Sequence, residues 1–198
     1  KDVLFVEGLS LKQITNIIKN RTGIDSKEFE DHAMRPHEFF DDYDFVKDLP
    51  KDATLEGYLF PDTYRVDDTL TTDLLIRKML SNFGKKFSHQ LREEARDKGW
   101  TTHEVVTLAS IIEKEVQTPE DKKIVAGIFE NRLNAGQRLE SDVTINYGLE
   151  LDPTLDSSVF TKTNTPYNTY VIQGLPPGPI ANPGMASIDA VLNPKASD

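Results

Sequence analysis

The stretch TTHEVVTLASIIEKEV, residues 101–116, is the part of the chain that decides the fold. Thr101 and Glu104 have the spacing of a capping box, in which each side chain satisfies an unpaired amide at a helix start. At about 100° per residue, the apolar residues share one stripe: Val105, Leu108, Ala109, Ile112 and Val116. The residues expected to face outward are Thr107, Ser110, Lys114 and Gln117. The stretch therefore predicts a helix that is mostly buried.

Other helices are predicted on both sides of this one. A capping box at Ser10 opens a helix, and a second helix begins near Ser26, before an irregular, aromatic-rich linker over residues 34–50. Further helices are expected over residues 72–83, 85–97, 119–134 and 186–192. Strand-like segments are expected within residues 57–64 and at 143–147 and 171–172. Residues 174–184 hold three glycines and four prolines, so they predict a rigid, non-helical wall that packs on the body.

The composition excludes several classes of protein. With 198 residues and a hydrophobic fraction of 37%, the chain can form a core and is not disordered. A net charge of −10 without a clustered basic patch argues against a nucleic-acid partner. The absence of cysteine removes disulfides and thiol nucleophiles, and the four histidines have no metal-ligand spacing. No metal site is predicted.

Glu113 and Glu115 fall on the two flanks of the apolar stripe in the central helix. A carboxyl that is partly buried against apolar side chains keeps its proton more readily, as a general acid must. The alternative is that both only border a core helix and pair with cations. Residues two apart on a helix point in nearly opposite directions, so they cannot together flank one glycosidic bond. Any second carboxylate would have to come from elsewhere, and Glu140 or Asp142 is the nearest candidate.

The segment TPYNTY, residues 165–170, is dense in tyrosine rings and amide-bearing side chains. Such groups suit the hydroxyl and acetamido groups of sugars. The alternative is an aromatic segment that packs on the proline-rich wall.

Several motifs together resemble one known family. They are Leu108–Glu115, Asn131–Leu133, Tyr167–Tyr170, Gly174–Ile180, Asn182–Gly184 and, upstream, Glu56–Tyr64. Their order and spacing resemble those of the endolytic murein transglycosylases of the MltG, or YceG-like, type, over almost the whole chain. The sequence departs from the family pattern at Gly136-Gln137 and at Glu140, which stands where the family commonly has glutamine.

The resemblance implies a bacterial enzyme on the extracytoplasmic face of the cell membrane. One N-terminal membrane helix outside this stretch would anchor it, beside the cell-wall synthesis machinery. It would cut nascent peptidoglycan glycan strands internally, between N-acetylmuramic acid and N-acetylglucosamine, and leave 1,6-anhydromuramoyl ends without a cofactor. The resemblance assigns the catalytic acid to Glu113. The residues expected to hold the sugars are Asp142, Tyr167, Asn168, Tyr170 and Glu140.

The expected fold class is α+β, with helices and short strands. Residues 1–50 are expected to be part of a LysM-like region with a linker, and residues 51–198 a catalytic domain that lacks its C-terminal strand. Two alternatives to the transglycosylase stay open. One is a muramidase that uses water, with Asp142 or Glu140 as the second carboxylate. The other is a non-catalytic module that binds cell-wall glycan.

Overall fold

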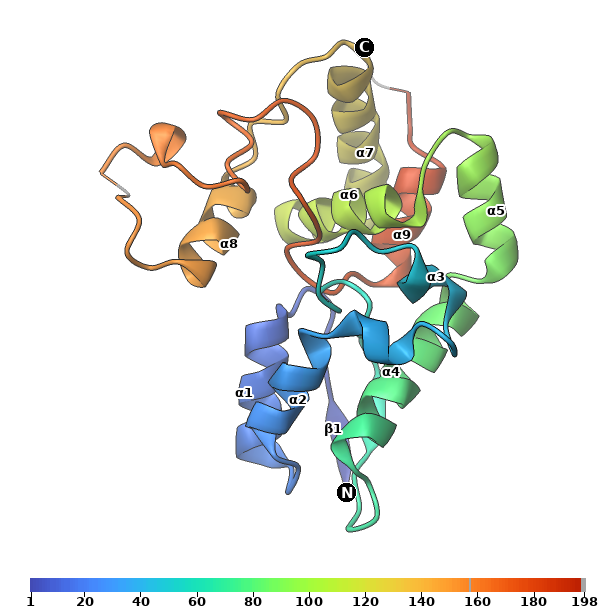
Figure 1. Ribbon diagram of the computed structural model, residues 1–198. Coiled ribbons are helices and arrows are strands. Elements are labelled where there is room, and N and C mark those ends of the chain that lie inside the picture. The colour runs from blue at the N-terminus through green and yellow to red at the C-terminus, as the bar shows by residue number, and fades with distance from the viewer. Residues whose placement is uncertain (157, 197–198) are drawn as a thin grey trace.

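The computed structural model describes residues 1–156 and 158–196, which form a mostly helical structure with one small sheet (Figure 1). Strands β1 (Asp2–Leu4) and β2 (Thr63–Arg65) pair antiparallel, with Val3 opposite Tyr64. The α-helices are α1 (Leu11–Arg21), α2 (Ser26–Ala33), α3 (Asp44–Lys47), α4 (Thr72–Lys86), α5 (His89–Asp97), α6 (Thr102–Glu115), α7 (Pro119–Asn134), α8 (Asp142–Leu151) and α9 (Met185–Leu192). Two short 3₁₀ helices are η1 (Pro36–Phe39) and η2 (Phe160–Lys162). The expected α+β class is confirmed.

Helix α6 is the centre of the fold, as its sequence predicts. The Thr101 capping box is present, and all residues from Val105 to Glu113 are buried. Helices α5, α7, α8 and α9 all contact α6 (Figure 1). The prediction that Thr107 and Ser110 face outward was wrong. Each hydroxyl donates to a backbone carbonyl at 2.7 Å, and this satisfies the buried polar group inside the core.

The N-terminal helices form the lower part of Figure 1 and share the core of the rest. Helix α1 packs on α2, and α2 packs on α4. One hydrophobic cluster joins Phe5, Ile14 and Phe29 with Ile111 and Ile188. The linker at residues 34–50 packs through buried aromatic rings, as predicted, although α3 and η1 lie within it. The LysM-like character of residues 1–50 stays a prediction.

The strand prediction for Val143–Tyr147 was wrong, because these residues belong to α8. Three β-branched residues in a row favour a strand locally, but tertiary packing overrides this preference. Thr144, Ile145, Tyr147 and Gly148 are buried, while Asp142 and Asn146 are exposed, which is a helical pattern. The second expected strand, Val171–Ile172, is a turn. Helix α5 also begins later than predicted, where Ser88 caps it.

The Gly- and Pro-rich segment is the rigid wall that its composition predicts. Ile180 donates its amide to Ser110 Oγ at 2.9 Å, and Asn182 Oδ1 accepts the amides of Gly57 and Leu59 at 2.9 Å each. Gly57 has φ +91°, and a Cβ there would lie 2.6 Å from Pro179. Only glycine allows this approach. The wall is therefore fixed to both α6 and the loop before β2.

In the described residues, no helix is both long enough and apolar enough to span a membrane.

Candidate active site

Helix α6 places its two C-terminal glutamates in different environments. Glu113 is buried and accepts three hydrogen bonds, one from α7 and two from the start of α9. Lys122 Nζ donates at 2.8 Å, the Gly184 amide at 3.0 Å and Ser187 Oγ at 2.5 Å. Lys122 is also buried, so the two form an ion pair inside the protein. All three partners are donors, which is the arrangement that an ionised carboxylate takes.

Glu115 is exposed and lies on a different surface of the protein. It accepts a hydrogen bond from Ser141 Oγ, at the residue that precedes α8. Asp142 is the first residue of α8, and Tyr170 donates its hydroxyl to Asp142 at 2.7 Å. The hydrogen bond to Asp142 raises the pKa of Tyr170, and the charges of Glu140 and Glu115 raise it further. We call Glu115, Glu140, Asp142 and Tyr170 the acidic face.

A hollow adjoins the acidic face at Glu140. Its volume is about 570 Å³, and Arg132, Arg138 and Gln173 help to line it. Glu140 itself has φ 55°, a left-handed conformation that non-glycine residues rarely adopt, and its amide donates to Thr169 O at 3.1 Å. Backbone strain of this kind is concentrated at functional sites.

Asn168 lies below the surface and supports the loop that carries Tyr170. It is fully buried, and its Nδ2 donates to Thr163 O at 2.8 Å. Its Oδ1 accepts the amide of Tyr170 at 3.0 Å. Both ends of the amide are therefore used inside the protein.

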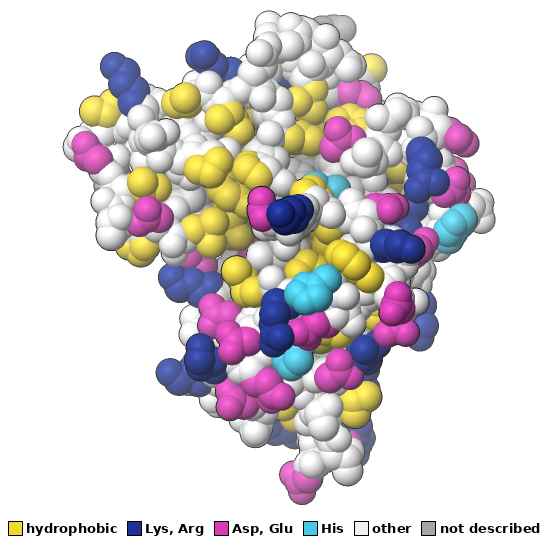
Figure 2. Space-filling model, viewed as in Figure 1, with side chains coloured by type: hydrophobic (Ala, Val, Ile, Leu, Met, Phe, Trp, Pro, Cys, Tyr) yellow, Lys and Arg dark blue, Asp and Glu magenta, His cyan; other side chains and the backbone are white. Residues whose placement is uncertain are grey.

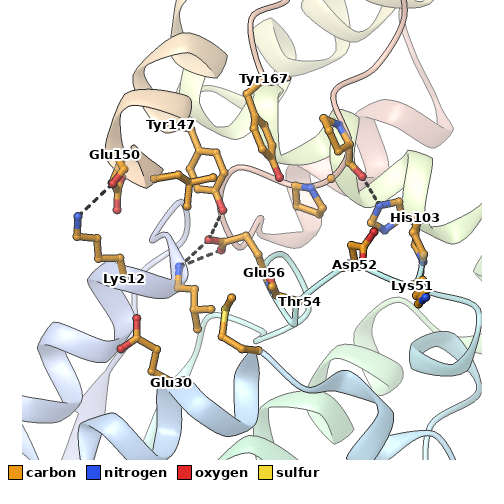
Figure 3. A pocket seen from close by; sticks show the side chains of 18 residues that line it. Lys12, Glu30, Lys51, Asp52, Thr54, Glu56, His103, Tyr147, Glu150 and Tyr167 are labelled. Carbon is orange, nitrogen blue, oxygen red and sulfur yellow. Dashed lines mark hydrogen bonds between the residues drawn. The ribbon is translucent and has the colours of Figure 1, made fainter. Parts of the chain in front are cut away.

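Tyr167 lies apart from the acidic face and lines a separate cavity with Tyr147 and Glu56 (Figure 3). The five residues expected to hold sugars thus divide into three groups. Asp142, Tyr170 and Glu140 come together beside Glu115, Asn168 is internal, and Tyr167 faces the cavity.

Sequence reasoning missed Glu56, which is buried and joins three distant segments. Its carboxyl accepts the Leu11 amide at 2.9 and 3.0 Å, Asn182 Nδ2 at 2.9 Å and the Tyr147 hydroxyl at 3.1 Å. Burial raises the pKa of Glu56 to about 8, although the hydrogen bonds from Leu11 and Tyr147 act in the opposite direction. The only feature of the sequence that pointed to Glu56 was its position at the start of the Glu56–Tyr64 motif. Nothing in the sequence indicated that Lys122 and Ser187 contact Glu113, because both residues lie on other helices.

Among residues 1–156 and 158–196, no group of three or more histidine and acidic side chains is placed to hold a metal ion.

Comparisons with known proteins agree with this architecture. The sequence profile of the YceG-like family matches residues 1–198. An endolytic murein transglycosylase of Streptococcus pneumoniae (serotype 2, strain D39) is 37% identical over 158 residues, 77% of this chain and 28% of that protein. Another endolytic murein transglycosylase, from Bacillus subtilis, is 32% identical over 213 residues, 99% of this chain and 57% of that protein.

A solved structure is similar as well. The crystal structure of a YceG-like protein from Listeria monocytogenes covers all of this chain and 67% of its own, with a TM-score of 0.85 and 30% identity. The chain spans between about a quarter and about three fifths of the length of the two curated relatives. Since the profile and the relatives both match most of its length, this chain belongs to the YceG-like family.

Proposed function

We propose that this chain cuts murein glycan strands internally as a lytic transglycosylase, with Glu115 as the proton donor. Three observations support this: the family, the activity after which two relatives are named, and the contrast between the two glutamates of α6. Glu115 is exposed beside Asp142 and Tyr170, where a strand can reach it. Glu113, which the sequence resemblance assigns as the acid, is bound to three donors in the core.

The proposed reaction needs one residue in two roles. Protonated Glu115 gives its proton to the glycosidic oxygen between N-acetylmuramic acid and N-acetylglucosamine, and the bond from that oxygen to muramic C1 breaks. Deprotonated Glu115 then takes the proton from the muramic 6-hydroxyl, whose oxygen bonds to C1 and closes the anhydro ring. The net proton transfer runs from the 6-hydroxyl to the leaving oxygen. The attacking hydroxyl is tethered, so proximity favours it over water.

The rest of the acidic face can assist by charge. Positive charge develops at C1 in the oxocarbenium-like transition state. Asp142 is fixed by the Tyr170 hydroxyl, and a carboxylate fixed near that carbon would stabilise the developing charge. Glu140 adds a further carboxyl at the rim of the neighbouring hollow.

A muramidase that uses water is the second candidate, because Asp142 and Glu140 lie beside Glu115 and could activate water. Digestion of uncrosslinked glycan strands in heavy-oxygen water separates the two, with mass spectrometry of the ends. The transglycosylase gives anhydro ends that are one water lighter and carry no label. Labelled reducing ends would establish the muramidase, and intact strands with measurable binding would establish a non-catalytic module.

The proposal extends to the cellular setting that the resemblance implies. We place the protein on the extracytoplasmic face of a bacterial membrane, beside the cell-wall synthesis machinery. Protease treatment of intact spheroplasts tests this, because an extracytoplasmic domain is digested and a cytoplasmic one is protected.

A further inference from the structure

A cavity of about 610 Å³ lies between the N-terminal helices and the Gly- and Pro-rich wall, apart from the acidic face. Residues of α1, α2, α8, the loop at 50–56 and the wall all line it. The rings of Tyr147 and Tyr167 point into it, with centroids 4.9 Å apart and planes at 67° (Figure 3). Its volume is in the range of pockets that bind small organic ligands.

The walls of the cavity include apolar side chains that the fold does not bury. Met34 is 54% exposed and Leu151 is 57% exposed, and they come from the end of α2 and the end of α8. Figure 2 shows hydrophobic side chains gathered on this face, between the region of α8 and the N-terminal helices below it. Exposed apolar side chains that gather at a cavity are typical of a binding site.

The charges around the cavity limit the chemistry of its ligand. Three carboxylates line it against two ammonium groups: Glu30, Asp52 and Glu150 against Lys12 and Lys51. Burial raises the pKa of Glu56 to about 8, so this fourth carboxyl is mainly a neutral polar group at neutral pH. A ligand that carries several carboxylates, such as a peptide stem, would be repelled. A neutral N-acetylated sugar offers apolar ring faces and a methyl group to the tyrosines and to Met34 and Leu151. Its amide and hydroxyl groups can bond the polar side chains.

Helix α8 connects this cavity with the acidic face. Asp142, at its first turn, belongs to the acidic face, and Glu150, at its last turn, lines the cavity. Eight residues of helix rise about 12 Å. That span is on the order of a disaccharide, so one glycan strand can lie along α8 and occupy both places.

We propose that the cavity is a remote sugar-binding subsite, which holds a neutral N-acetylhexosamine segment of the strand while Glu115 acts on a bond further along. The inference rests on the proposed function for the identity of the strand. The subsite would add affinity for long strands and none for substrates too short to reach it.

Calorimetric titration with an oligomer of N-acetylglucosamine tests the subsite directly. Met34→Ser and Leu151→Ser remove apolar contacts from two sides, and both side chains are exposed, so the fold should persist. Each variant should weaken binding roughly tenfold, the loss expected for a buried apolar side chain. Leu74→Ser is the matched control, because Leu74 is 45% exposed on α4, does not line the cavity and should leave binding unchanged.

Three results would overturn the subsite: no binding of the oligomer, equal binding by both variants and wild type, or binding only of muramyl sugars that carry a peptide stem. A parallel cleavage assay on long strands separates this inference from the proposed function. If the wild type binds the oligomer but cuts no strand, the proposed function fails and the subsite stands. If Met34→Ser and Leu151→Ser bind and cut as the wild type does, only the subsite fails.

Discussion

The ammonium group of Lys122 lies 2.8 Å from the carboxylate of Glu113, and both side chains are almost completely buried. This ion pair joins α6 to α7, and Ser187 and Gly184 join the same carboxylate to α9. Glu113 therefore holds together the three helices that meet behind the acidic face. Glu115 lies two residues further along α6 and is exposed to solvent.

Glu113→Gln is expected to destabilise the fold. The substitution leaves the Lys122 charge buried without its partner, which costs about 3–5 kcal/mol in the free energy of unfolding. Adding Lys122→Met should restore part of the loss, because both charges are then gone. Denaturant unfolding of the two single variants and the double variant measures this. Equal stability of Glu113→Gln and wild type would show that the ion pair does not hold the helices.

Glu115→Gln is expected to lower the activity and to leave the stability of the fold almost unchanged. Activity on glycan strands should fall by roughly 10²–10⁴-fold, as for a lost general acid. The free energy of unfolding should change by less than about 0.5 kcal/mol, because the side chain is exposed. Strand cleavage and thermal melting are measured on the same preparation. If Glu115→Gln cuts strands normally while a folded Glu113→Gln does not, the acid is Glu113, as the sequence resemblance assigns it.

Asn168→Ala is expected to lower the stability of the fold without weakening the binding of substrate. It removes a fully buried amide, leaves the Tyr170 amide without its partner and takes one of the two donors from Thr163 O, which keeps only the Thr165 amide; the loss costs about 1–3 kcal/mol. Lower thermal stability with an unchanged KM in the folded fraction is the expected result. Tyr170→Phe is the comparison, since it removes only the exposed hydroxyl that bonds Asp142. A raised KM without a loss of stability for Asn168→Ala would instead place the amide in contact with sugars.

The sequence predicted the parts of this fold that depend on local signals. The Ser10 and Thr101 capping boxes, the Thr118-Pro119 helix start and the non-helical wall at 174–184 are all confirmed. Helix α8 was missed because Val143, Thr144 and Ile145 favour a strand, and only packing against α6 and the Thr169 loop shows otherwise.

The candidate site was only partly predictable for the same reason. Helical spacing separated the directions of Glu113 and Glu115, and the structure brings Glu140 and Asp142 close to Glu115. A role for either of them as a second carboxylate stays a prediction. Spacing could not show which glutamate is enclosed. That depends on Lys122 and Ser187, whose distance to Glu113 is set by tertiary structure.

The stability of the protein should fall as the pH rises through the neutral range, because of Glu56. Burial raises the pKa of its carboxyl from an ordinary value of 4.5 to about 8, so the fold favours the protonated form relative to the unfolded chain. The stability that this contributes is fully present below pH 4.5 and is lost as the pH rises to about 8.

Glu56→Gln removes the titration, so its melting temperature should change less between pH 5 and pH 9 than that of the wild type. Glu94→Gln, an exposed control on α5, should retain the wild-type pH dependence. If Glu56→Gln also retains it, another group is responsible. If the wild type instead gains stability across this range, the three donors that surround the carboxyl, the Leu11 amide, Asn182 Nδ2 and the Tyr147 hydroxyl, keep Glu56 ionised in the fold.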